Sequence, residues 1–407
     1  MTEMPRPWLH VIGFGPDGFA GLRPAARAAL EKAELVIGAD RHHRLSREIR
    51  AERIAWPSPF SALIETIARY RGRQLAVLAT GDPLWYSVGA RIARAFPKEE
   101  TVFHPQLSAF QLAACRLGWS LADLETLTVH GRPVEQVIPF IQPGMRWLVL
   151  TTGEDTPGEI ARILTDRGYG PSRLHVFAEM GTPDESRHFS TAEEWRGKVP
   201  PFNTMGVEIV PGPAAEIRSR MPGLPDAAFR SDGVMTKREV RALVLSRLMP
   251  MRGQLLWDIG CGSGSVAIEW MRAARDGLAI GIDRRADRLA LARENADRLG
   301  APRLKLVEGE VPEMLAELPR PDAVFLGGGI SPETIRLAWE RLKPAGRIAA
   351  TAVSLGSERV LAESLATFGG DLVRVGIERA EMLGGMTAWR PLRHVTLWSA
   401  IKPVEGA

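Results

Sequence analysis

The stretch Asp258-Ile259-Gly260-Cys261-Gly262-Ser263-Gly264 decides the fold of the second half of the chain. It follows an apolar run at 255–259, which predicts a buried strand, and it precedes a helical pattern. Glycines at such a turn let the backbone approach a ligand closely, and the first turn of the helix supplies free N–H donors. The spacing is G-x-G-x-G, whereas dinucleotide-binding loops have G-x-G-x-x-G. The loop therefore predicts an α/β domain with a nucleoside-binding site, and a nicotinamide enzyme is the rival interpretation.

Three further elements stand at the ends of the next predicted strands. Asp283 closes the second strand, where a carboxylate can accept hydrogen bonds from both ribose hydroxyls. Glu308-Gly309-Glu310 follows the third strand, and Glu310 is placed to accept from an adenine amino group. Gly327-Gly328-Gly329 ends the fourth strand. Ligands of open α/β sheets bind beyond the carboxyl ends of the strands, so this glycine run leaves room there for a broad, flat substrate.

This ordered set resembles the class I S-adenosylmethionine-dependent methyltransferases. Cys261 is open to two interpretations, a nucleophile or a small residue that fills the turn. The second is favoured, because no histidine lies close in sequence to activate a thiol. The cofactor contacts that the resemblance implies are Asp258, Gly260, Cys261, Gly262, Ser263, Gly264, Asp283, Gly309 and Glu310.

A short polar motif, Thr236-Lys237-Arg238-Glu239, precedes the first strand of this half. Thr236 and Glu239 fit a capping box, the pair of side-chain hydrogen bonds that starts a helix. Lys237 and Arg238 lie beside the expected cofactor mouth, where they are candidates for binding acidic side arms of a substrate and for assisting the chemistry. The alternative is that they form a solvated pair in the first turn. The substrate contacts predicted for this half are Thr236, Lys237, Arg238, Gly327 and Gly328.

Five elements containing glycine or polar residues mark the first half. They are Val11–Gly18, Thr80–Gly89, His104–Gln111, Glu179–Glu185 and Asn203–Glu208. In this order they resemble the tetrapyrrole methylase family, also called class III methyltransferases, over nearly all of residues 8–210. The resemblance implies two α/β lobes with S-adenosylmethionine folded into the cleft between them. The cofactor contacts carried over by position are Gly13, Gly15, Pro16, Gly81, Asp82, Pro83, Tyr86, Ser108 and Ala109.

Two residues of the first half depart from the family's pattern. Asp17 stands where a glycine is usual, which is tolerable if Gly18 takes the turn. Gln106 stands where a proline usually precedes the serine of the third element, and this departure bears on the contacts expected of Ser108.

Short apolar runs alternate with helical stretches along both halves, which favours an α/β fold throughout. Breaks rich in proline and glycine mark a domain boundary. We expect a tetrapyrrole methylase domain over 1–210 with its lobes meeting near 112–120, a linker over 211–230, and a class I Rossmann-like domain over 231–407. Strands are predicted over 9–13, 35–37, 75–79, 102–104, 127–129, 147–150, 174–177, 207–210, 255–259, 279–282, 304–307, 323–326, 347–351, 373–377 and 394–398, and helices over 24–33, 236–248, 285–299 and 332–342. The last two strands lie close together, which suggests an antiparallel edge on a parallel sheet.

The composition limits the class of protein. The chain has 407 residues, 45% of them hydrophobic and 25% charged, with a formal net charge of +4, as expected of a globular protein with two or three domains. No apolar run approaches the ~20 residues of a membrane span, and no dense run of lysine and arginine suggests nucleic acid. The cysteines, Cys115 and Cys261, are far apart. A disulfide framework or metal site is therefore not expected, and a cytoplasmic location fits.

A class III lobe pair followed by a class I domain resembles the precorrin-6B C5,15-methyltransferases (decarboxylating) of aerobic cobalamin biosynthesis. The resemblance implies methylation of C5 by the first half, and methylation of C15 with loss of the ring C acetate carboxyl by the second, which gives precorrin-8. It further implies two S-adenosylmethionine sites, a small tetrapyrrole substrate and a homo-oligomer. An RNA methyltransferase fusion and a regulatory fusion, in which one half binds cofactor without turnover, are the alternatives.

Overall fold

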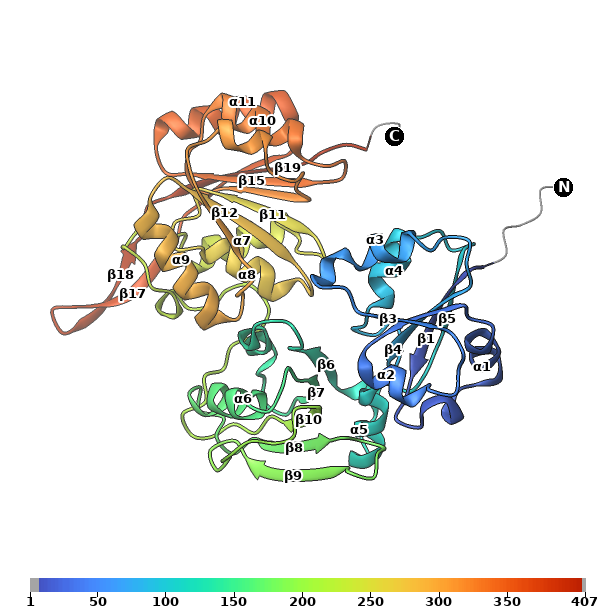
Figure 1. Cartoon of the computed structure of the whole chain (residues 1–407). Coiled ribbons are helices and arrows are strands. Elements are labelled where there is room, and N and C mark those ends of the chain that lie inside the picture. The colour runs from blue at the N-terminus through green and yellow to red at the C-terminus, as the bar shows by residue number, and fades with distance from the viewer. Residues whose placement is uncertain (1–6, 405–407) are drawn as a thin grey trace. The chain divides into compact units, whose positions relative to one another are not determined.

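The computed structural model of the chain describes residues 7–404 and is drawn in Figure 1. The chain divides into two compact units. The first comprises the chain up to Arg132 together with Pro143–Glu216, and the second comprises Pro133–Gln142 together with the chain from Ile217 onward. Short 3-10 helices are η1 (Gly18–Gly21), η2 (Phe60–Ala62), η3 (Leu121–Asp123), η4 (Val134–Phe140), η5 (Asp226–Ala228) and η6 (Glu313–Ala316).

The first lobe of the first unit is a parallel five-stranded sheet in the order β3-β2-β4-β1-β5. Both faces are covered, since Leu9 and Val11 of β1 pack in one apolar cluster with α3 and α4, while Ile12 and Phe14 pack in another with α1. The elements are β1 (Leu9–Phe14), β2 (Leu35–Gly38), β3 (Glu52–Ala55), β4 (Leu75–Thr80), β5 (Thr101–His104), α1 (Pro24–Glu31), α2 (Asp40–Leu45), α3 (Leu63–Ala68) and α4 (Gly89–Ala95).

The second lobe is a mixed sheet in the order β6-β7-β10-β8-β9, in which β6 and β7 pair in parallel and the other pairs are antiparallel. Helix α5 packs on this sheet through Phe110 and Ala113. The chain therefore passes from the first lobe to the second at about Ser108, a few residues before the expected 112–120. The elements are α5 (Ala109–Leu117), β6 (Glu125–Thr128), β7 (Arg146–Leu150), α6 (Thr156–Thr165), β8 (Arg173–Ala178), β9 (Ser186–Thr191) and β10 (Asn203–Glu208).

The second unit is built on a seven-stranded sheet in the order β13-β12-β11-β14-β15-β19-β16. Helices α7 to α9 cover one face of the sheet, and α10 and α11 cover the other (Figure 1). Neighbouring residues of β11 face these opposite sides, since Leu256 packs with α7 to α9 and Trp257 packs with α10 and α11. The elements are α7 (Arg238–Leu248), β11 (Leu255–Ile259), α8 (Ser265–Ala273), β12 (Leu278–Asp283), α9 (Ala286–Leu299), β13 (Lys305–Glu308), β14 (Ala323–Leu326), α10 (Pro332–Arg341), β15 (Arg347–Ala352), α11 (Leu355–Phe368), β16 (Asp371–Val375), β17 (Glu378–Leu383), β18 (Met386–Pro391) and β19 (Val395–Ile401).

The expected α/β architecture is confirmed, including the antiparallel edge, because β19 pairs antiparallel with both β15 and β16. Four strands, β3, β9, β17 and β18, were not expected from the sequence. Each lies at a sheet edge or in the two-stranded sheet of β17 and β18. Strands at such places need no continuous apolar run, so the sequence does not mark them.

One local expectation is wrong, and another agrees with the structure only in part. The expected capping box is absent: α7 begins at Arg238 after Lys237, no side chain caps it, and Glu239 instead accepts a hydrogen bond from Arg379 at 2.6 Å. The segment expected as a linker over 211–230 contains the boundary between the two units, after Glu216, but its second part belongs to the second unit. Leu224 and Phe229 are buried in the core cluster of the second unit, because the chain from Ile217 onward packs there.

Candidate active sites

The carboxyl ends of the central strands of the second unit open into a cavity of about 850 Å³. This is within the range of small-molecule sites. The predicted site residues that line it are Thr236, Lys237, Asp258, Gly260, Cys261, Gly262, Ser263, Asp283, Gly309, Glu310, Gly327 and Gly328. Two predicted residues do not line it: Gly264 starts α8 with φ +76°, and Arg238 is exposed. Twelve residues from five separate segments are thus brought to one cavity.

The glycine loop and the glycine run after β14 touch each other at the floor of this cavity. Gly260 has a φ of +68°, and a Cβ on it would lie 2.7 Å from Gly328 Cα. Only glycine satisfies both the conformation and the close approach. Asp283 fixes the same loop from the next strand, because its Oδ2 accepts from the Gly262 N–H at 3.0 Å and its Oδ1 from the Arg285 N–H at 3.1 Å. A carboxylate has further lone pairs with which to accept from a ligand.

Asp258 and Ser263 carry buried oxygen atoms that lack a hydrogen-bond partner among the described residues. Asp258 is 1% exposed, and its Oδ2 accepts from the Ala267 N–H at 2.9 Å while its Oδ1 accepts nothing. Burial is the main reason that its pKa rises to about 7, and the charge of Asp283 adds to the rise. Native proteins rarely leave buried polar atoms unpaired. The two orphaned oxygens therefore fit a ligand with N–H or O–H donors, such as S-adenosylmethionine.

Cys261 is 7% exposed and packs against β12, with its Sγ 3.0 Å from the place where a Cβ on Gly281 would stand. Burial raises the pKa of its thiol, and the carboxylates of Asp258 and Asp283 add to this rise. The thiolate is the nucleophilic form of cysteine. The structure thus supports the interpretation of Cys261 as a residue that fills the turn.

Three cations that line the cavity, Lys237, Arg284 and Arg393, have no partner among residues 7–404. Arg284 directly follows β12 and is exposed. Lys237 precedes α7, and Arg393 lies between β18 and β19; none of the three makes a side-chain hydrogen bond or ion pair there. Arg288, by contrast, is paired with Asp232 at 2.9 Å. Lys237 was predicted, but Arg393 was missed, because it stands in no motif and reaches the cavity only through the path of the chain after β18.

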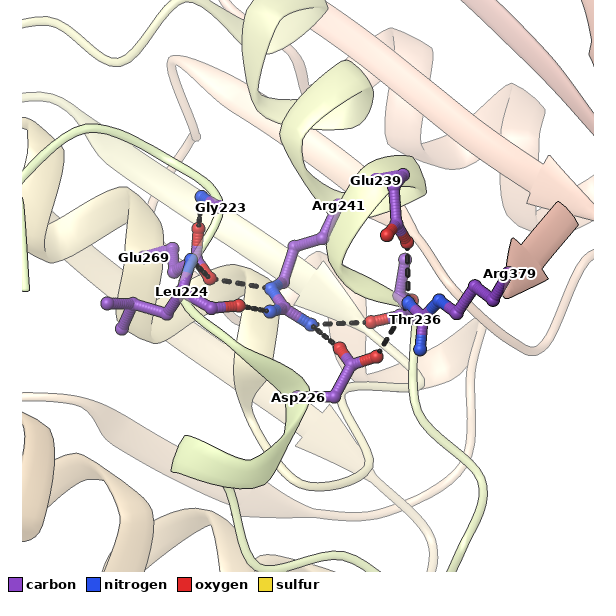
Figure 2. A network of polar contacts seen from close by, with 8 residues as sticks. All are labelled: Gly223, Leu224, Asp226, Thr236, Glu239, Arg241, Glu269 and Arg379. Atoms are coloured by element: carbon purple, nitrogen blue, oxygen red, sulfur yellow. Dashed lines mark hydrogen bonds and ion pairs between the residues drawn. The ribbon is translucent and has the colours of Figure 1, made fainter. Parts of the chain in front are cut away.

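A buried ion-pair network supports the loop that carries Thr236 and Lys237 (Figure 2). Arg241 is fully buried, and its Nη1 donates to the Thr236 carbonyl at 2.6 Å and to Asp226 at 3.2 Å. Its Nε donates to Glu269 at 2.6 Å. Arg379 of β17 donates to Asp226 at 3.0 Å. The network connects the cavity wall at Thr236 and Lys237 to α7, to α8 and to the hairpin formed by β17 and β18.

The first unit has a second, much smaller cavity in the cleft between its lobes, about 40 Å³. Four predicted residues line it, Gly15, Pro16, Gly81 and Ala109. Gly13 lies behind them, since a Cβ on it would stand 2.4 Å from the Gly81 carbonyl oxygen.

The other predicted residues of this half do not line the cavity. Asp82 accepts from the Leu84 N–H at 2.8 Å, and the Tyr86 hydroxyl donates to the Thr126 carbonyl at 2.9 Å. Ser108 caps α5 through a contact with Gln111. These side chains are engaged in contacts within the first unit, and Pro83, which follows Asp82, is buried.

The two departures from the expected pattern are accommodated locally. Gly18 takes the turn that Asp17 cannot, with a φ of +60° and an N–H that donates to the Gly15 carbonyl at 3.2 Å. Gln106 packs beside the glycine loop, and its Nε2 donates to the Gly21 carbonyl at 3.1 Å.

Asn203 is an unpredicted polar residue in this cleft. It is 8% exposed and lines the cavity, and its amide nitrogen donates to the Pro200 carbonyl at 2.9 Å and to the Gly153 carbonyl at 3.2 Å. These bonds orient the amide, and its Oδ1 is left without a partner among the described residues. The cleft thus holds an orphaned acceptor, as the larger cavity does, and this acceptor matches an N–H donor of a ligand.

Comparison with known proteins agrees with this division. The family model of tetrapyrrole (corrin/porphyrin) methylases matches residues 8–195, and the model of the precorrin methyltransferase domain matches residues 227–402. A protein of Sinorhizobium sp. named precorrin-6Y C(5,15)-methyltransferase [decarboxylating] is 43% identical over 399 residues, 97% of each chain. A protein of the same name from Mycobacterium tuberculosis is 34% identical over 97% of this chain and 100% of its own. The chain belongs to the precorrin-6Y C(5,15)-methyltransferase (decarboxylating) family.

Members of this methyltransferase family take the methyl group from S-adenosylmethionine. A shorter relative, from Pyrobaculum calidifontis, is named probable cobalt-precorrin-6B C(15)-methyltransferase (decarboxylating) and is 39% identical over 189 residues, 44% of this chain and 96% of its own. Within residues 7–404 no helix is long and apolar enough to cross a membrane, and no group of three or more potential metal-ligating side chains is found.

Proposed function

We propose that the two units carry the two methylations separately, the first at C5 and the second at C15 with decarboxylation, each with its own S-adenosylmethionine. The observation that carries this proposal is the pair of orphaned buried acceptors, Asn203 Oδ1 and Asp258 Oδ1, one beside each glycine-lined cavity. The name of the short Pyrobaculum relative supports the assignment of C15 methylation and decarboxylation to one domain.

The reaction requires the protein to position the cofactor and the substrate, and it does not require a strong base. S-adenosylmethionine supplies an activated methyl group, and the meso carbons of a reduced tetrapyrrole are enamine-like nucleophiles. The loop at Gly260–Ser263 and Asp283 would hold and orient the cofactor, and alignment alone accounts for a large part of such catalysis. Lys237 and Arg393 hold carboxylates of the substrate. The conjugated macrocycle accepts the electron pair that is released when the ring C acetate loses carbon dioxide.

Product mass and binding stoichiometry test this proposal directly. Incubation of the chain with the reduced precorrin and methyl-labelled cofactor is expected to add two methyl groups and remove one carbon dioxide. Calorimetric titration of the intact chain with S-adenosylhomocysteine is expected to show two sites, of which Asn203→Ala removes one. A single site in the unmodified chain, or methylation without loss of carbon dioxide, would overturn the division of labour.

Lys237→Met and Arg393→Met are each expected to raise KM for the second reaction about tenfold or more, because each removes a charge-assisted hydrogen bond to a substrate carboxylate. Neither is expected to change the affinity for S-adenosylhomocysteine. Arg390→Met is the matched control, since Arg390 is exposed, pairs with Glu381 and does not line the cavity. Steady-state kinetics on the methylated product separates KM from kcat, and an unchanged KM in both variants would contradict the role in substrate binding.

A further inference from the structure

The guanidinium of Arg41 lies at the cleft of the first unit. Arg41 belongs to α2 in the first lobe, and its guanidinium carbon stands 4.0 Å from the ring centroid of Phe202, the residue before β10 in the second lobe. Both residues line the small cavity, together with Pro16, Gly81 and Asn203. Arg41 therefore reaches from one lobe to the other across the place where the proposed cofactor lies.

Arg41 makes no hydrogen bond and no ion pair with the described residues, although it is only partly exposed. Burial lowers the pKa of its guanidinium, while the charge of Glu179 raises that pKa and the charge of Arg44 lowers it. Glu179 is near enough to act through space, but it lies beyond ion-pair distance. Removing a cation from water is costly unless the cation is paired, so a half-buried guanidinium without an acceptor is unusual in a native protein.

Other arginines of the same lobe show what a structural role looks like. Arg53 donates to the Ser46 hydroxyl at 2.7 Å and to the Ile49 carbonyl at 2.8 Å. Arg71 donates to both oxygens of Glu100, at 2.7 and 2.8 Å. The Arg41 guanidinium contacts only the face of the Phe202 ring, and this contact leaves its N–H groups free.

We propose that Arg41 is a carboxylate-binding residue of the first active site. This rests on the proposed function, because both molecules proposed for the cleft carry carboxylates: the methionine part of the cofactor and the side arms of the tetrapyrrole. A planar guanidinium presents parallel N–H donors that match the two oxygens of a carboxylate. The contact with Phe202 keeps the guanidinium at the cleft before the ligand arrives, and the same contact joins the lobes around it.

The test compares three variants of the full-length chain. Arg41→Met removes the charge and keeps an apolar side chain against Phe202. Arg44→Met is the matched control, because Arg44 is an exposed arginine on the same helix and does not line the cavity. Glu179→Gln tests the competing explanation, that Arg41 serves only to hold the lobes together through Glu179.

Two probes distinguish the two sources of the carboxylate. S-adenosylhomocysteine, measured by calorimetry, carries the carboxylate of the cofactor. Uroporphyrin, measured by fluorescence, is a stable tetrapyrrole with carboxylate side arms, and its methyl ester is the matched ligand without charge. The wild-type chain is also assayed for product mass with the reduced precorrin, so failure of the proposed function is seen separately from failure of the role of Arg41.

Arg41→Met is expected to weaken one of the two probes about tenfold at the first site, with Arg44→Met and Glu179→Gln unchanged. Weaker binding of uroporphyrin, with unchanged binding of its methyl ester, identifies a substrate side arm as the partner of Arg41. Weaker binding of S-adenosylhomocysteine identifies the carboxylate of the cofactor as the partner. The proposal is overturned if both probes bind Arg41→Met as tightly as the wild type, or if Glu179→Gln reproduces its loss. A thermal transition of the first unit that matches the wild type excludes misfolding as the cause.

Discussion

Replacing Asp258 by asparagine is expected to stop C15 methylation and decarboxylation while C5 methylation continues. Asp258 Oδ1 is a buried acceptor without a partner among the described residues, and Oδ2 already accepts from the Ala267 N–H. An asparagine keeps the size of the side chain, but it turns one acceptor into a donor and cannot take the negative charge that we propose faces the sulfonium and ammonium groups of the cofactor. A buried charged group that loses its partner changes the free energy of binding by about 2–5 kcal/mol, so a loss of at least about thirtyfold in the second reaction is expected.

Product mass measures this effect. A singly methylated product that still has its carboxyl group is expected to accumulate, and calorimetry is expected to find one S-adenosylhomocysteine site. Asp287→Asn is the matched control, because Asp287 is an exposed carboxylate on α9 that pairs with Arg285. Loss of both methylations in Asp258→Asn would point to one composite site in place of two.

The raised pKa of Asp258 gives the same variant a second readout, which is how its free energy of unfolding depends on pH. The folded chain holds a proton on Asp258 up to about pH 7, whereas an unfolded chain releases it near 3.8. The folded state therefore loses stability as the pH rises from about 4 to about 7. Asparagine cannot ionise, so cofactor-free Asp258→Asn is expected to be more stable than the wild type above pH 7, by up to about 4 kcal/mol. Thermal unfolding at pH 5 and pH 8 checks this, and an equal difference at both values would contradict it.

The parts of these sites that the sequence reveals are those built by local geometry. A G-x-G-x-G loop between a strand and a helix is recognisable in the sequence, because Gly260 has a positive φ, a conformation that favours glycine. Asp283 and Glu310 are marked in the same way by their places after strands. The carboxyl ends of parallel strands meet at one edge of a sheet, so the sequence alone is enough to gather these elements into one site.

The parts that the sequence does not reveal depend on partners far along the chain. Glu239 was expected to cap α7, but Arg379, which is 140 residues away, takes its carboxylate. Whether Arg41 and Arg393 are paired depends on which carboxylates the fold brings near them, and no local pattern carries that information. Asn203 is a similar case. Its Oδ1 can be identified as the unpaired atom only because the structure shows its Nδ2 donating to the carbonyls of Gly153 and Pro200.

The buried network around Arg241 leads to the second large effect, on stability. Arg241 is 0% exposed and Glu269 is 1% exposed, and Glu269 also accepts from the Gly223 N–H at 2.6 Å and the Leu224 N–H at 3.0 Å (Figure 2). Arg241→Met leaves the Glu269 carboxylate buried without its cation. Breaking a buried pair in this way typically costs about 3–5 kcal/mol. The second unit is therefore expected to unfold at a temperature lower by about 6–20 °C.

Scanning calorimetry on the full chain measures the change, and two further variants locate its cause. Arg379→Met removes a half-exposed partner of Asp226 and Glu239, so it is expected to cost no more than about 1 kcal/mol. The double variant Arg241→Met with Glu269→Gln removes the uncompensated charge, so it is expected to recover part of the stability lost in Arg241→Met alone. If the double variant is the less stable of the two, the cost comes from lost packing and backbone contacts rather than from an unpaired charge.

The same network links stability to substrate binding, because Arg241 holds the carbonyl of Thr236 directly before Lys237. If Lys237 binds a substrate carboxylate, its position depends on that bond, since no side chain caps α7 to hold the loop in another way. Arg241→Lys keeps the charge beside Glu269 but loses the forked contacts to Thr236 and Leu224. It is therefore expected to be more stable than Arg241→Met and yet to show a raised KM for the second reaction. An unchanged KM would mean that the loop keeps its place without Arg241.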